Sequence, residues 1–574
     1  MEKLYVYAIF HANLSFSSIP NEKYPDVIDH CYWPLLDLIK KGYRIGFEFP
    51  ASTLRTIYEI DESFVHELAE AWREGKCEVI GSGFNQNIFP LIPYAVNKAN
   101  VEKGMEEYEA LLGKRPSLAF VNEQTYSGGL PRIYKEAGFE GIIMDWDNAT
   151  EYQGFADEFR YQPVLVEGVD GTVLPLVWNS SLNSYKFQRC IYNRISIGQY
   201  VSEVMAHHMV GKKRSLLLYG TDVEIFNYRP ITQEIVSGEI AKVGAIFSEL
   251  SKHDDVELVV PSDVLNYFAP THVVRIETPE SPIPCKNRDD YNVLRWAVSG
   301  RDDVWFNTEC YKIYRMLTQL AFFEGHENLR PEMEALNLLW SSDLRTKTTN
   351  QKHYDGKKNV GEVSRSLSTR YEMVGSHIPI EEDFVLINPH AEAWRGEPYN
   401  LNFHFSKGVM QERFDLSLRG ERIVSQCDEI TRYRDGSIRT ISLVCLPYLA
   451  PQEAAQGKFV PVQKNVVTGV KVSRHAGNVT VKTPSVDIAV SEVTGGDMRS
   501  LVYPEIFGSS LAGYLSPVFY DHVGHSHDYY SMGIQMIDKS KGFINDTKRT
   551  TIAVKETEGA ATIRTVLTLS LIHI

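Results

Sequence analysis

Short apolar runs alternate with amphipathic segments along residues 1–265, and this alternation restricts the chain to few folds. The runs have the length of buried strands and lie at residues 4–10, 44–49, 77–80, 118–121, 141–144, 173–178, 215–219 and 256–260. Between them, residues 64–72, 96–112, 195–209 and 232–253 carry apolar side chains at helical spacing. Strands that alternate with helices form a parallel sheet, and seven or eight repeats favour a closed barrel. We therefore predict an α/β fold that begins with a distorted (β/α)7 barrel over residues 1–270.

The rest of the chain has a different pattern. Residues 310–323 and 331–339 show helical spacing and precede a polar stretch at 346–361, which predicts a small helical bundle over 290–375. Short apolar runs separated by turn residues follow at 384–387, 401–405, 414–418, 438–446 and 466–472, and Asp435-Gly436 is a hairpin signal. This spacing predicts a C-terminal antiparallel β-sandwich over 380–574. The chain stops inside a strand-like run at 562–574, which suggests that the sandwich is truncated.

Charge and composition exclude several classes of protein. The formal net charge of −15 argues against a nucleic-acid partner, because phosphate binding needs a basic surface. No apolar run approaches the roughly 20 residues that span a bilayer, and residues 1–10 resemble a strand more than a signal sequence. Seven scattered cysteines without a Cys-x-x-Cys pair suit reduced thiols. We expect a cytoplasmic protein with no membrane partner; its oligomeric state is not predicted.

Polar side chains gather where the predicted barrel strands end. They are His11 and Asn13, then Ser82, Asn85 and Gln86, then Glu123, then Asp145 and Asp147, and finally Asp222 and Glu224. Any one of these groups could simply cap the helix that follows its strand. Five such groups together favour a functional site, because the C-terminal ends of barrel strands are where active sites lie.

Two of these residues are carboxylates at the ends of separate strands. Glu123 follows the run at 118–121, and Asp222 follows the run at 215–219. A pair of carboxyl groups is the basic requirement for cleaving a glycosidic bond. Glu224 lies two residues after Asp222 and would share its face if the strand continued, so Glu224 is an alternative acid.

The motifs around these residues resemble those of glycoside hydrolase family 57. That family opens with a strand ending in a segment that is commonly His-x-His-Gln-Pro, matched in part by residues 11–14. Its second motif, a strand followed by Gly and a polar run, resembles residues 78–85. Its third places a Glu after a short strand and before a helix that ends in an Ala-Gly turn, as do Glu123 and residues 130–139. Its fourth, Asp-x-Glu-x-Phe, is matched by residues 222–226.

The resemblance implies that Glu123 is the catalytic nucleophile and Asp222 the general acid/base. We expect the substrate to be bound by His11, Asn13, Asn85, Trp146, Asp147 and Glu224. The chain departs from the family pattern where residues 13–15 replace His-Gln-Pro and where Asn227 replaces the usual Gly. Glu123 also lacks the flanking Trp and aromatic residue common in the α-glucan enzymes. These changes leave the catalytic pair intact and bear on the identity of the substrate.

The order of barrel, bundle and sandwich also resembles the architecture of glycoside hydrolase family 38. Those mannosidases need an Asp nucleophile and a metal held partly by His-x-Asp, whereas His11-x-Asn13 lacks that carboxylate. His207-His208 lies late in a predicted helix, where a solvated surface is expected rather than a metal site. The His-rich residues 521–528 resemble a metal cluster, but we interpret them as a loop of the sandwich that leans over the barrel mouth. We therefore predict no metal and no cofactor.

The sequence thus predicts a retaining glycoside hydrolase or transglycosylase that acts on α-linked oligo- or polysaccharide through two carboxylates. One alternative is a metal-dependent hydrolase similar to polysaccharide deacetylases, but no His pair at the required spacing follows a strand. The other is a non-catalytic sugar-binding protein that has kept the barrel, and the intact Glu123 and Asp222 argue against it.

Overall fold

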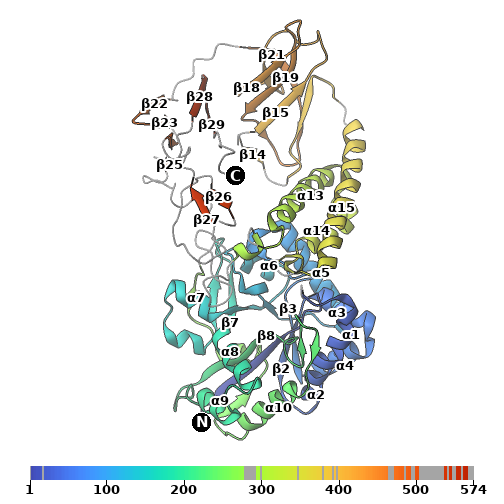
Figure 1. Ribbon diagram of the computed structural model, residues 1–574, viewed down its shortest axis with the longest axis vertical. Coiled ribbons are helices and arrows are strands. Elements are labelled where there is room, and N and C mark those ends of the chain that lie inside the picture. The colour runs from blue at the N-terminus through green and yellow to red at the C-terminus, as the bar shows by residue number, and fades with distance from the viewer. Residues whose placement is uncertain are drawn as a thin grey trace. The chain divides into compact units, whose positions relative to one another are not determined.

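The computed structural model describes residues 2–15, 18–276, 293–297, 300–345, 348–377, 380–390, 393–395, 399–462, 471–483, 486–492, 498–502, 535–538, 542–545, 551–557 and 560–566. The chain divides into two compact units (Figure 1). The first comprises Met1–Leu317 and Leu329–Ser368, and the second comprises Thr318–Asn328 and Thr369–Ile574.

A curved, mainly parallel sheet forms the centre of the first unit. Its main strands are β1 (Leu4–His11), β2 (Ile45–Phe49), β3 (Cys77–Gly81), β4 (Leu118–Phe120), β5 (Gly141–Asp145), β7 (Val173–Asn179) and β8 (Arg214–Asp222), paired in the order β8-β1-β2-β3-β4-β5-β7. Next to them, β6 (Val164–Glu167) runs antiparallel to β7, β12 (Val273–Val274) pairs with β6, and β11 (Val256–Leu258) pairs with β1. This arrangement confirms the predicted distorted (β/α)7 barrel.

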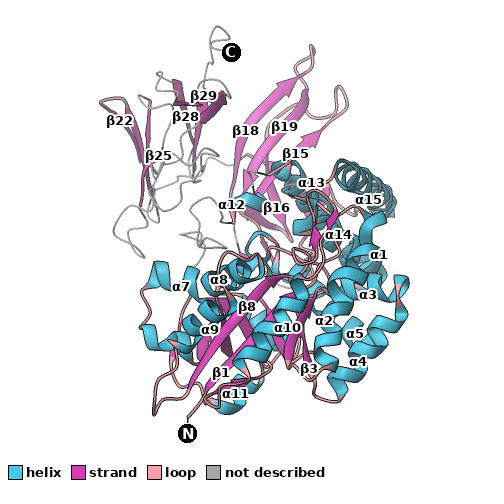
Figure 2. Cartoon of the chain, turned by 60° about the horizontal axis from the view of Figure 1, so that its bottom comes forward, coloured by secondary structure: helices cyan, strands magenta, loops and turns pink. Residues whose placement is uncertain are grey.

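Helices surround the barrel strands (Figure 2). They are α1 (Tyr24–Val27), α2 (Trp33–Lys40), α3 (Ala51–Ile60), α4 (Glu62–Arg73), α5 (Tyr94–Leu112), α6 (Leu130–Glu136), α7 (Trp146–Gln153), α8 (Ser181–Ile191), α9 (Ile197–Met205), α10 (Glu239–Leu250) and α11 (Asp263–Tyr267). Further helices follow at α12 (Leu294–Ala297), α13 (Asp303–Glu324), α14 (Arg330–Leu339) and α15 (Asn350–His377). Among the described helices, none is both long and apolar enough to cross a membrane.

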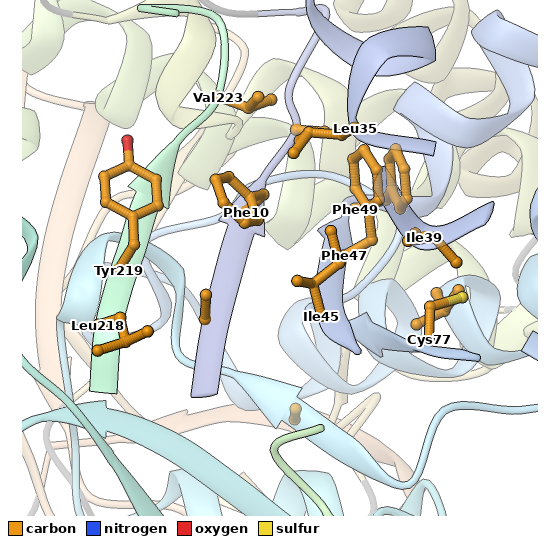
Figure 3. Close-up of a cluster of buried hydrophobic side chains, with 14 of the residues drawn as sticks. Phe10, Leu35, Ile39, Ile45, Phe47, Phe49, Cys77, Leu218, Tyr219 and Val223 are labelled. Atoms are coloured by element: carbon orange, nitrogen blue, oxygen red, sulfur yellow. The ribbon is translucent and has the colours of Figure 1, made fainter. Parts of the chain in front are cut away.

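Side chains alternate between the two faces of each barrel strand. On the outer face, Phe10, Phe47 and Phe49 pack with Leu35 and Ile39 of α2 in one buried cluster (Figure 3). A second buried cluster fills the interior and contains Tyr7, Ile9, Ile80, Leu118, Phe120, Ile143, Val177 and Leu217. The barrel is therefore solid along most of its length, and only the C-terminal ends of its strands can line a cavity.

A β-bulge in β8 decides which way the last residues of that strand point. Leu217 lies opposite Tyr7 of β1, but the next residue of β1 lies opposite residue 219, so Leu218 is an extra residue. Leu217 faces the interior, and regular alternation from it would turn residue 222 outward. Because of the bulge, Asp222 instead lies opposite His11 and shares its inward face.

The helix predicted over residues 232–253 is shorter in the structure and begins at Glu239. Before it, the chain forms β9 (Tyr228–Arg229) and β10 (Glu234–Ile235). The side-chain oxygen of Asn227 accepts hydrogen bonds from the backbone N–H groups of Glu239 (2.8 Å) and Ile240 (3.2 Å). These are donors that a helix N-terminus leaves without an internal partner, so Asn227 fixes where α10 begins.

Asn227 also has a left-handed backbone, with φ of +60°. This conformation explains why Asn can replace the Gly that the family pattern usually has here, because both residues tolerate positive φ.

Asn227→Ala should lower the free energy of unfolding by about 2 kcal/mol, since Ala loses the helix cap and strains the backbone. Asn227→Gly should cost less, because it loses the same side-chain hydrogen bonds, including the one from Asn227 Nδ2 to the carbonyl of His30 (3.0 Å), but does not strain the backbone. Urea unfolding of the two variants measures this, and an Ala variant as stable as the Gly variant would contradict it.

The polar stretch at 346–361 belongs largely to a helix, because α15 starts at Asn350. Pairs of side chains four residues apart occupy its surface, including Gln351 with Asp355 (3.0 Å) and Lys358 with Glu362 (3.7 Å). Such pairs can stabilise a helix whose sequence has no apolar residues at helical spacing. This is why the sequence pattern did not indicate a helix here.

The second unit contains antiparallel sheets. Two of them have the orders β13-β21-β16-β17 and β15-β19-β18. Their strands are β13 (Phe384–Ile387), β15 (Tyr399–His404), β16 (Phe414–Leu418), β17 (Glu421–Ile423), β18 (Ser425–Arg432), β19 (Ile438–Cys445) and β21 (Ala454–Pro461). Phe384, Leu416 and Leu443 from both sheets share one core, as expected of a sandwich. The hairpin predicted at Asp435-Gly436 joins β18 to β19.

The remaining described strands of this unit contain between two and seven residues. They are β14 (Trp394–Arg395), β20 (Tyr448–Leu449), β22 (Lys471–His475), β23 (Asn478–Lys482), β24 (Asp487–Ser491), β25 (Met498–Val502), β26 (Gln535–Asp538), β27 (Gly542–Asn545), β28 (Thr551–Thr557) and β29 (Ala560–Val566). The strand predicted at 466–472 overlaps β22, and the run at 562–574 overlaps β29. The other residues of both predicted runs lie outside the described residues.

Candidate active site

A cavity of about 490 Å³ lies at the C-terminal end of the barrel strands. Its volume is within the range of about 300–1,000 Å³ that is typical of small-molecule sites. It is lined by His11, Gln86, Phe120, Glu123, Gln124, Asp145, Asn179, Ser181, Leu182, Ser184, Tyr185, Gln188, Gly220, Thr221 and Asp222. Most of these side chains come from strand ends or from α8. This is the end of a parallel barrel at which active sites lie.

Glu123 reaches the cavity from a strained turn directly after β4. Glu123 and Gln124 both have left-handed backbones, with φ of +50° and +57°. Each such residue costs about 1–2 kcal/mol when it is not Gly. The turn is held by a hydrogen bond from the N–H of Thr125 to the carbonyl of Asn122 (3.0 Å). Gln86 Nε2 donates to Glu123 Oε1 (3.2 Å). Strain that is maintained beside a cavity indicates a functional position.

Asp222 ends β8 and lines the same cavity as Glu123. Its side chain is 25% exposed, and its Oδ1 lies 4.0 Å from His11 Nε2. Two residues earlier, a Cβ atom on Gly220 would lie 1.9 Å from Asn179 Oδ1, so only Gly fits beside that side chain. The structure thus brings the two predicted catalytic carboxylates to one cavity from two different strands.

His11 is positively charged in this environment. Its Nδ1 is hydrogen-bonded to the carboxylate of Glu48, which lies opposite it on β2. Burial alone would lower the pKa of His11. The charge and hydrogen bond of Glu48, with the charges of Asp222 and Glu224, outweigh burial and raise the pKa to about 10. An imidazolium therefore lies beside Asp222.

The pair of His11 and Glu48 predicts how stability depends on pH. The pKa of His11 is about 10 in the folded chain and about 6.5 in an unfolded one. A raised folded-state pKa gives stabilisation that is fully present below about pH 6.5 and is lost as the pH rises towards 10. Glu48→Gln should therefore lower the Tm most near pH 6, and its difference from the wild type should shrink by about pH 9. Calorimetry at the two pH values measures this.

Glu107→Gln is a matched control for Glu48→Gln. Glu107 is also buried, and its Oε1 accepts a hydrogen bond from Arg55 Nε (2.8 Å). Arg does not titrate in this pH range, so the loss of Tm in Glu107→Gln should be the same at both pH values. A loss that is also constant in Glu48→Gln would show that His11 is not an imidazolium.

Asn13 is buried and connects several segments of the first unit. Its Nδ2 donates to Gln86 Oε1 (2.5 Å) and to Asp343 Oδ1 (3.0 Å). Its backbone N–H donates to Glu224 Oε1 (2.7 Å), and Thr53 Oγ1 donates to its Oδ1 (3.2 Å). Asp343 lies between α14 and α15, so the region after the barrel also reaches this network. An amide can donate and accept at once, which suits Asn13 to the centre of the network.

Glu224 is fully buried and is not among the residues that line the cavity. Its Oε1 accepts hydrogen bonds from Tyr32 OH (2.5 Å) and from the N–H of Asn13. Burial and the charge of Asp222 raise the pKa of Glu224 to about 7. Glu224 and Asp222 therefore differ in access to the cavity although they are two residues apart.

Asp145 and Asp147 hold the N-terminus of α8. The N–H of Ser181 donates to Asp145 Oδ1 (2.7 Å), and the N–H of Leu182 donates to Asp147 Oδ2 (2.9 Å). Ser180 Oγ also donates to Asp147 Oδ2 (2.8 Å). Burial and the nearby charge of Asp147 raise the pKa of Asp145 well above its usual range. Asp145 lines the cavity, whereas Asp147 serves as a cap for α8.

Two other predicted site residues, Asn85 and Trp146, are buried and are not among the lining residues. The N–H of Asn85 donates to Asn100 Oδ1 (2.9 Å), and its carbonyl accepts from Asn100 Nδ2 (2.9 Å). Trp146 packs edge-on against Trp178, with ring centroids 5.1 Å apart. Asn85 thus holds the loop after β3 against α5, and Trp146 packs the start of α7 against β7.

Several side chains at the site are absent from the predicted set. Glu48 interrupts the apolar strand at 45–49 as a lone carboxylate, and alternation would have placed it inside the barrel. Asn179 follows an apolar run in the same way as the predicted residues did. Asp343 follows the predicted helix at 331–339, in a region with no strand ends, and that position favoured a structural role.

Two His-containing segments, residues 207–208 and 521–528, are the candidates for a metal site in the sequence. Within the described ranges, no three or more His, Cys, Asp or Glu side chains are placed to hold a metal ion. His207 Nδ1 is hydrogen-bonded with Tyr161 OH (2.9 Å), and burial lowers its pKa to about 4. The His-rich residues 521–528 lie outside the described residues.

The barrel and its sequence identify the chain as a glycoside hydrolase. Residues 16–277 match the family model described as glycosyl hydrolase family 57. The match covers the barrel after β1 and the predicted motifs from residue 78 onward. No curated protein matches the sequence.

Solved structures share the fold at low sequence identity. A 4-alpha-glucanotransferase from Thermococcus litoralis is 12% identical with a TM-score of 0.50, covering 98% of this chain and 80% of that chain. An alpha-mannosidase from Enterococcus faecalis is 13% identical with a TM-score of 0.51, covering 87% of this chain and 62% of that chain. At such identities the similarity is one of fold.

Proposed function

We propose that this chain is a retaining glycoside hydrolase or transglycosylase that acts on α-linked oligo- or polysaccharide. Glu123 is its nucleophile and Asp222 its general acid/base. The observation that carries this proposal is that both carboxylates line one cavity at the C-terminal end of the barrel. The strained turn at Glu123 and the bulge before Asp222 support it, because each directs a carboxylate to that cavity.

The reaction proceeds in two displacements. Glu123 attacks the anomeric carbon while Asp222 protonates the departing glycosidic oxygen, which leaves a glycosyl ester on Glu123. Asp222, now a carboxylate, then takes a proton from water or from a sugar hydroxyl, and that oxygen displaces Glu123. Two inversions at the same carbon retain its configuration. The product is a free sugar or a new glycoside.

The neighbours of the two carboxylates suit these roles. Gln86 Nε2 donates to Glu123 Oε1 (3.2 Å) and orients the nucleophile. The imidazolium of His11, 4.0 Å from Asp222, stabilises the negative charge that Asp222 acquires when it releases its proton. Glu224 is fully buried and bonded to Tyr32, which favours Asp222 as the group that meets substrate.

The substrate class rests on the family and on the names of proteins with the same fold. The Thermococcus litoralis structure is a 4-alpha-glucanotransferase, and the Enterococcus faecalis structure is an alpha-mannosidase. Both names concern α-linked sugars. Together with the family 57 match, they support an α-linked substrate here.

A panel of α-linked oligosaccharides, assayed with and without a chelator, tests this function. We expect hydrolysis or transfer on at least one member of the panel, and full activity in the chelator. Activity that disappears with the chelator and returns with a divalent metal would instead favour a metal-dependent hydrolase. Binding without turnover on every member would favour the non-catalytic sugar-binding protein.

A further inference from the structure

Helix α8 forms one wall of the cavity. Its lining residues are Ser181, Leu182, Ser184, Tyr185 and Gln188. These positions are spaced so that they share one face of the helix. The wall therefore presents an aromatic ring and an aliphatic side chain beside two hydroxyls and an amide. This combination matches a sugar, which has an apolar ring face and a rim of hydroxyl groups.

The aromatic side chains of α8 show that the helix has two distinct faces. Phe187 is fully buried and packs against Tyr219 and Phe247, with ring centroids 5.1 and 6.4 Å apart. Tyr185 is 60% exposed, and no described residue forms a hydrogen bond or ring contact with it. Leu182, one turn earlier, is also exposed. Packing thus accounts for Phe187 but not for Tyr185.

The wall is fixed to the strand that carries Asp222. The N–H of Gly220 on β8 donates to Ser184 Oγ (2.9 Å), and Asn183 Nδ2 donates to the carbonyl of Leu217 on the same strand (3.1 Å). The caps supplied by Asp145 and Asp147 hold the start of the helix. The α8 side chains are therefore preorganised relative to Asp222, which lowers the entropic cost of binding a ligand there.

We propose that α8 forms the subsite for the leaving-group sugar, and then for the acceptor sugar, with Tyr185 stacked on its ring. The proposal rests on the proposed function, because Asp222 protonates the glycosidic oxygen and so must lie on the leaving-group side of the bond. α8 is bonded to the strand that ends in Asp222. The hydroxyl that later displaces Glu123 approaches from the same side, so an acceptor sugar occupies the same wall.

Tyr185→Ala and Tyr185→Phe test the subsite with two substrates. Maltotriose has a leaving-group sugar, whereas α-glucosyl fluoride has only fluoride. Tyr185→Ala should lower kcat/KM on maltotriose roughly tenfold or more, and lower the ratio of transfer to hydrolysis similarly, because ring stacking is lost. It should change hydrolysis of the fluoride less than about twofold, and Tyr185→Phe should keep both activities because the ring remains. Tyr354→Ala removes an exposed Tyr on α15 that does not line the cavity, and should change nothing.

Equal losses on the two substrates, or no loss on maltotriose, would overturn the subsite. Binding to maltotriose and α-1,2-mannobiose, measured by calorimetry, separates this outcome from failure of the proposed function. If the wild type binds either sugar without turnover and Tyr185→Ala weakens that binding about tenfold, α8 is a sugar site and the proposed catalysis is wrong. If the wild type binds neither sugar, the subsite is overturned.

Discussion

Replacing Glu123 with Gln should abolish turnover, by roughly 10⁴-fold or more, while the protein stays folded. The amide has the shape of the carboxylate but cannot attack the anomeric carbon. Gln86 donates to Glu123 Oε1 in the wild type, and the amide oxygen of the variant can accept the same hydrogen bond. The turn at residues 122–125 should therefore survive the substitution. Release of sugar from the best substrate of the panel measures the loss, and a melting curve verifies the fold.

Glu140→Gln is the matched control, because it makes the same chemical change at an exposed position. It should retain wild-type activity and Tm. Near-normal activity in Glu123→Gln, with a native melting curve, would place the nucleophile elsewhere. Loss of activity together with a lowered Tm would instead show that Glu123 supports the fold of the strained turn.

The barrel could be predicted because its strands are buried on both faces. Such strands are continuous apolar runs, and runs such as 77–80 and 141–144 lie within one residue of β3 and β5. The polar residues at their ends therefore marked the end of the barrel at which a cavity occurs. His11, Glu123 and Asp222 were found from this pattern, and all three line the cavity.

Other features depend on interactions that a local pattern does not contain. The bulge at Leu218 results from pairing of β8 with β1, and strict alternation from Leu217 would have turned Asp222 outward. Asp343 meets Asn13 only after the region that follows the barrel has packed against it. The start of α10 is set by Asn227, whose left-handed backbone is not evident from the sequence. The bulge, the contact between Asp343 and Asn13, and the start of α10 are each determined by contacts between segments that are distant in the sequence.

The roles of the two carboxylates can be separated with azide. Asp222→Ala should lower turnover of natural substrates by roughly 10²–10⁴-fold, the usual contribution of a general acid/base. On an activated aryl glycoside the first step needs no acid, so the glycosyl ester on Glu123 should accumulate. Azide attacks that ester without a base, so it should restore turnover and give a glycosyl azide of retained configuration. In Glu123→Ala, azide takes the place of the missing nucleophile and should give the inverted product.

Glu224→Gln distinguishes Asp222 from its neighbour in the same assay. Glu224 is fully buried and bonded to Tyr32, so azide should not rescue any activity lost in this variant. Rescue of Glu224→Gln but not of Asp222→Ala would move the acid/base role by two residues. The configuration of the azide products, read by NMR, tests the mechanism itself. If wild-type hydrolysis gives the inverted sugar, the carboxyl groups work at the wider spacing of about 6.5–9.5 Å, and water attacks without a covalent intermediate.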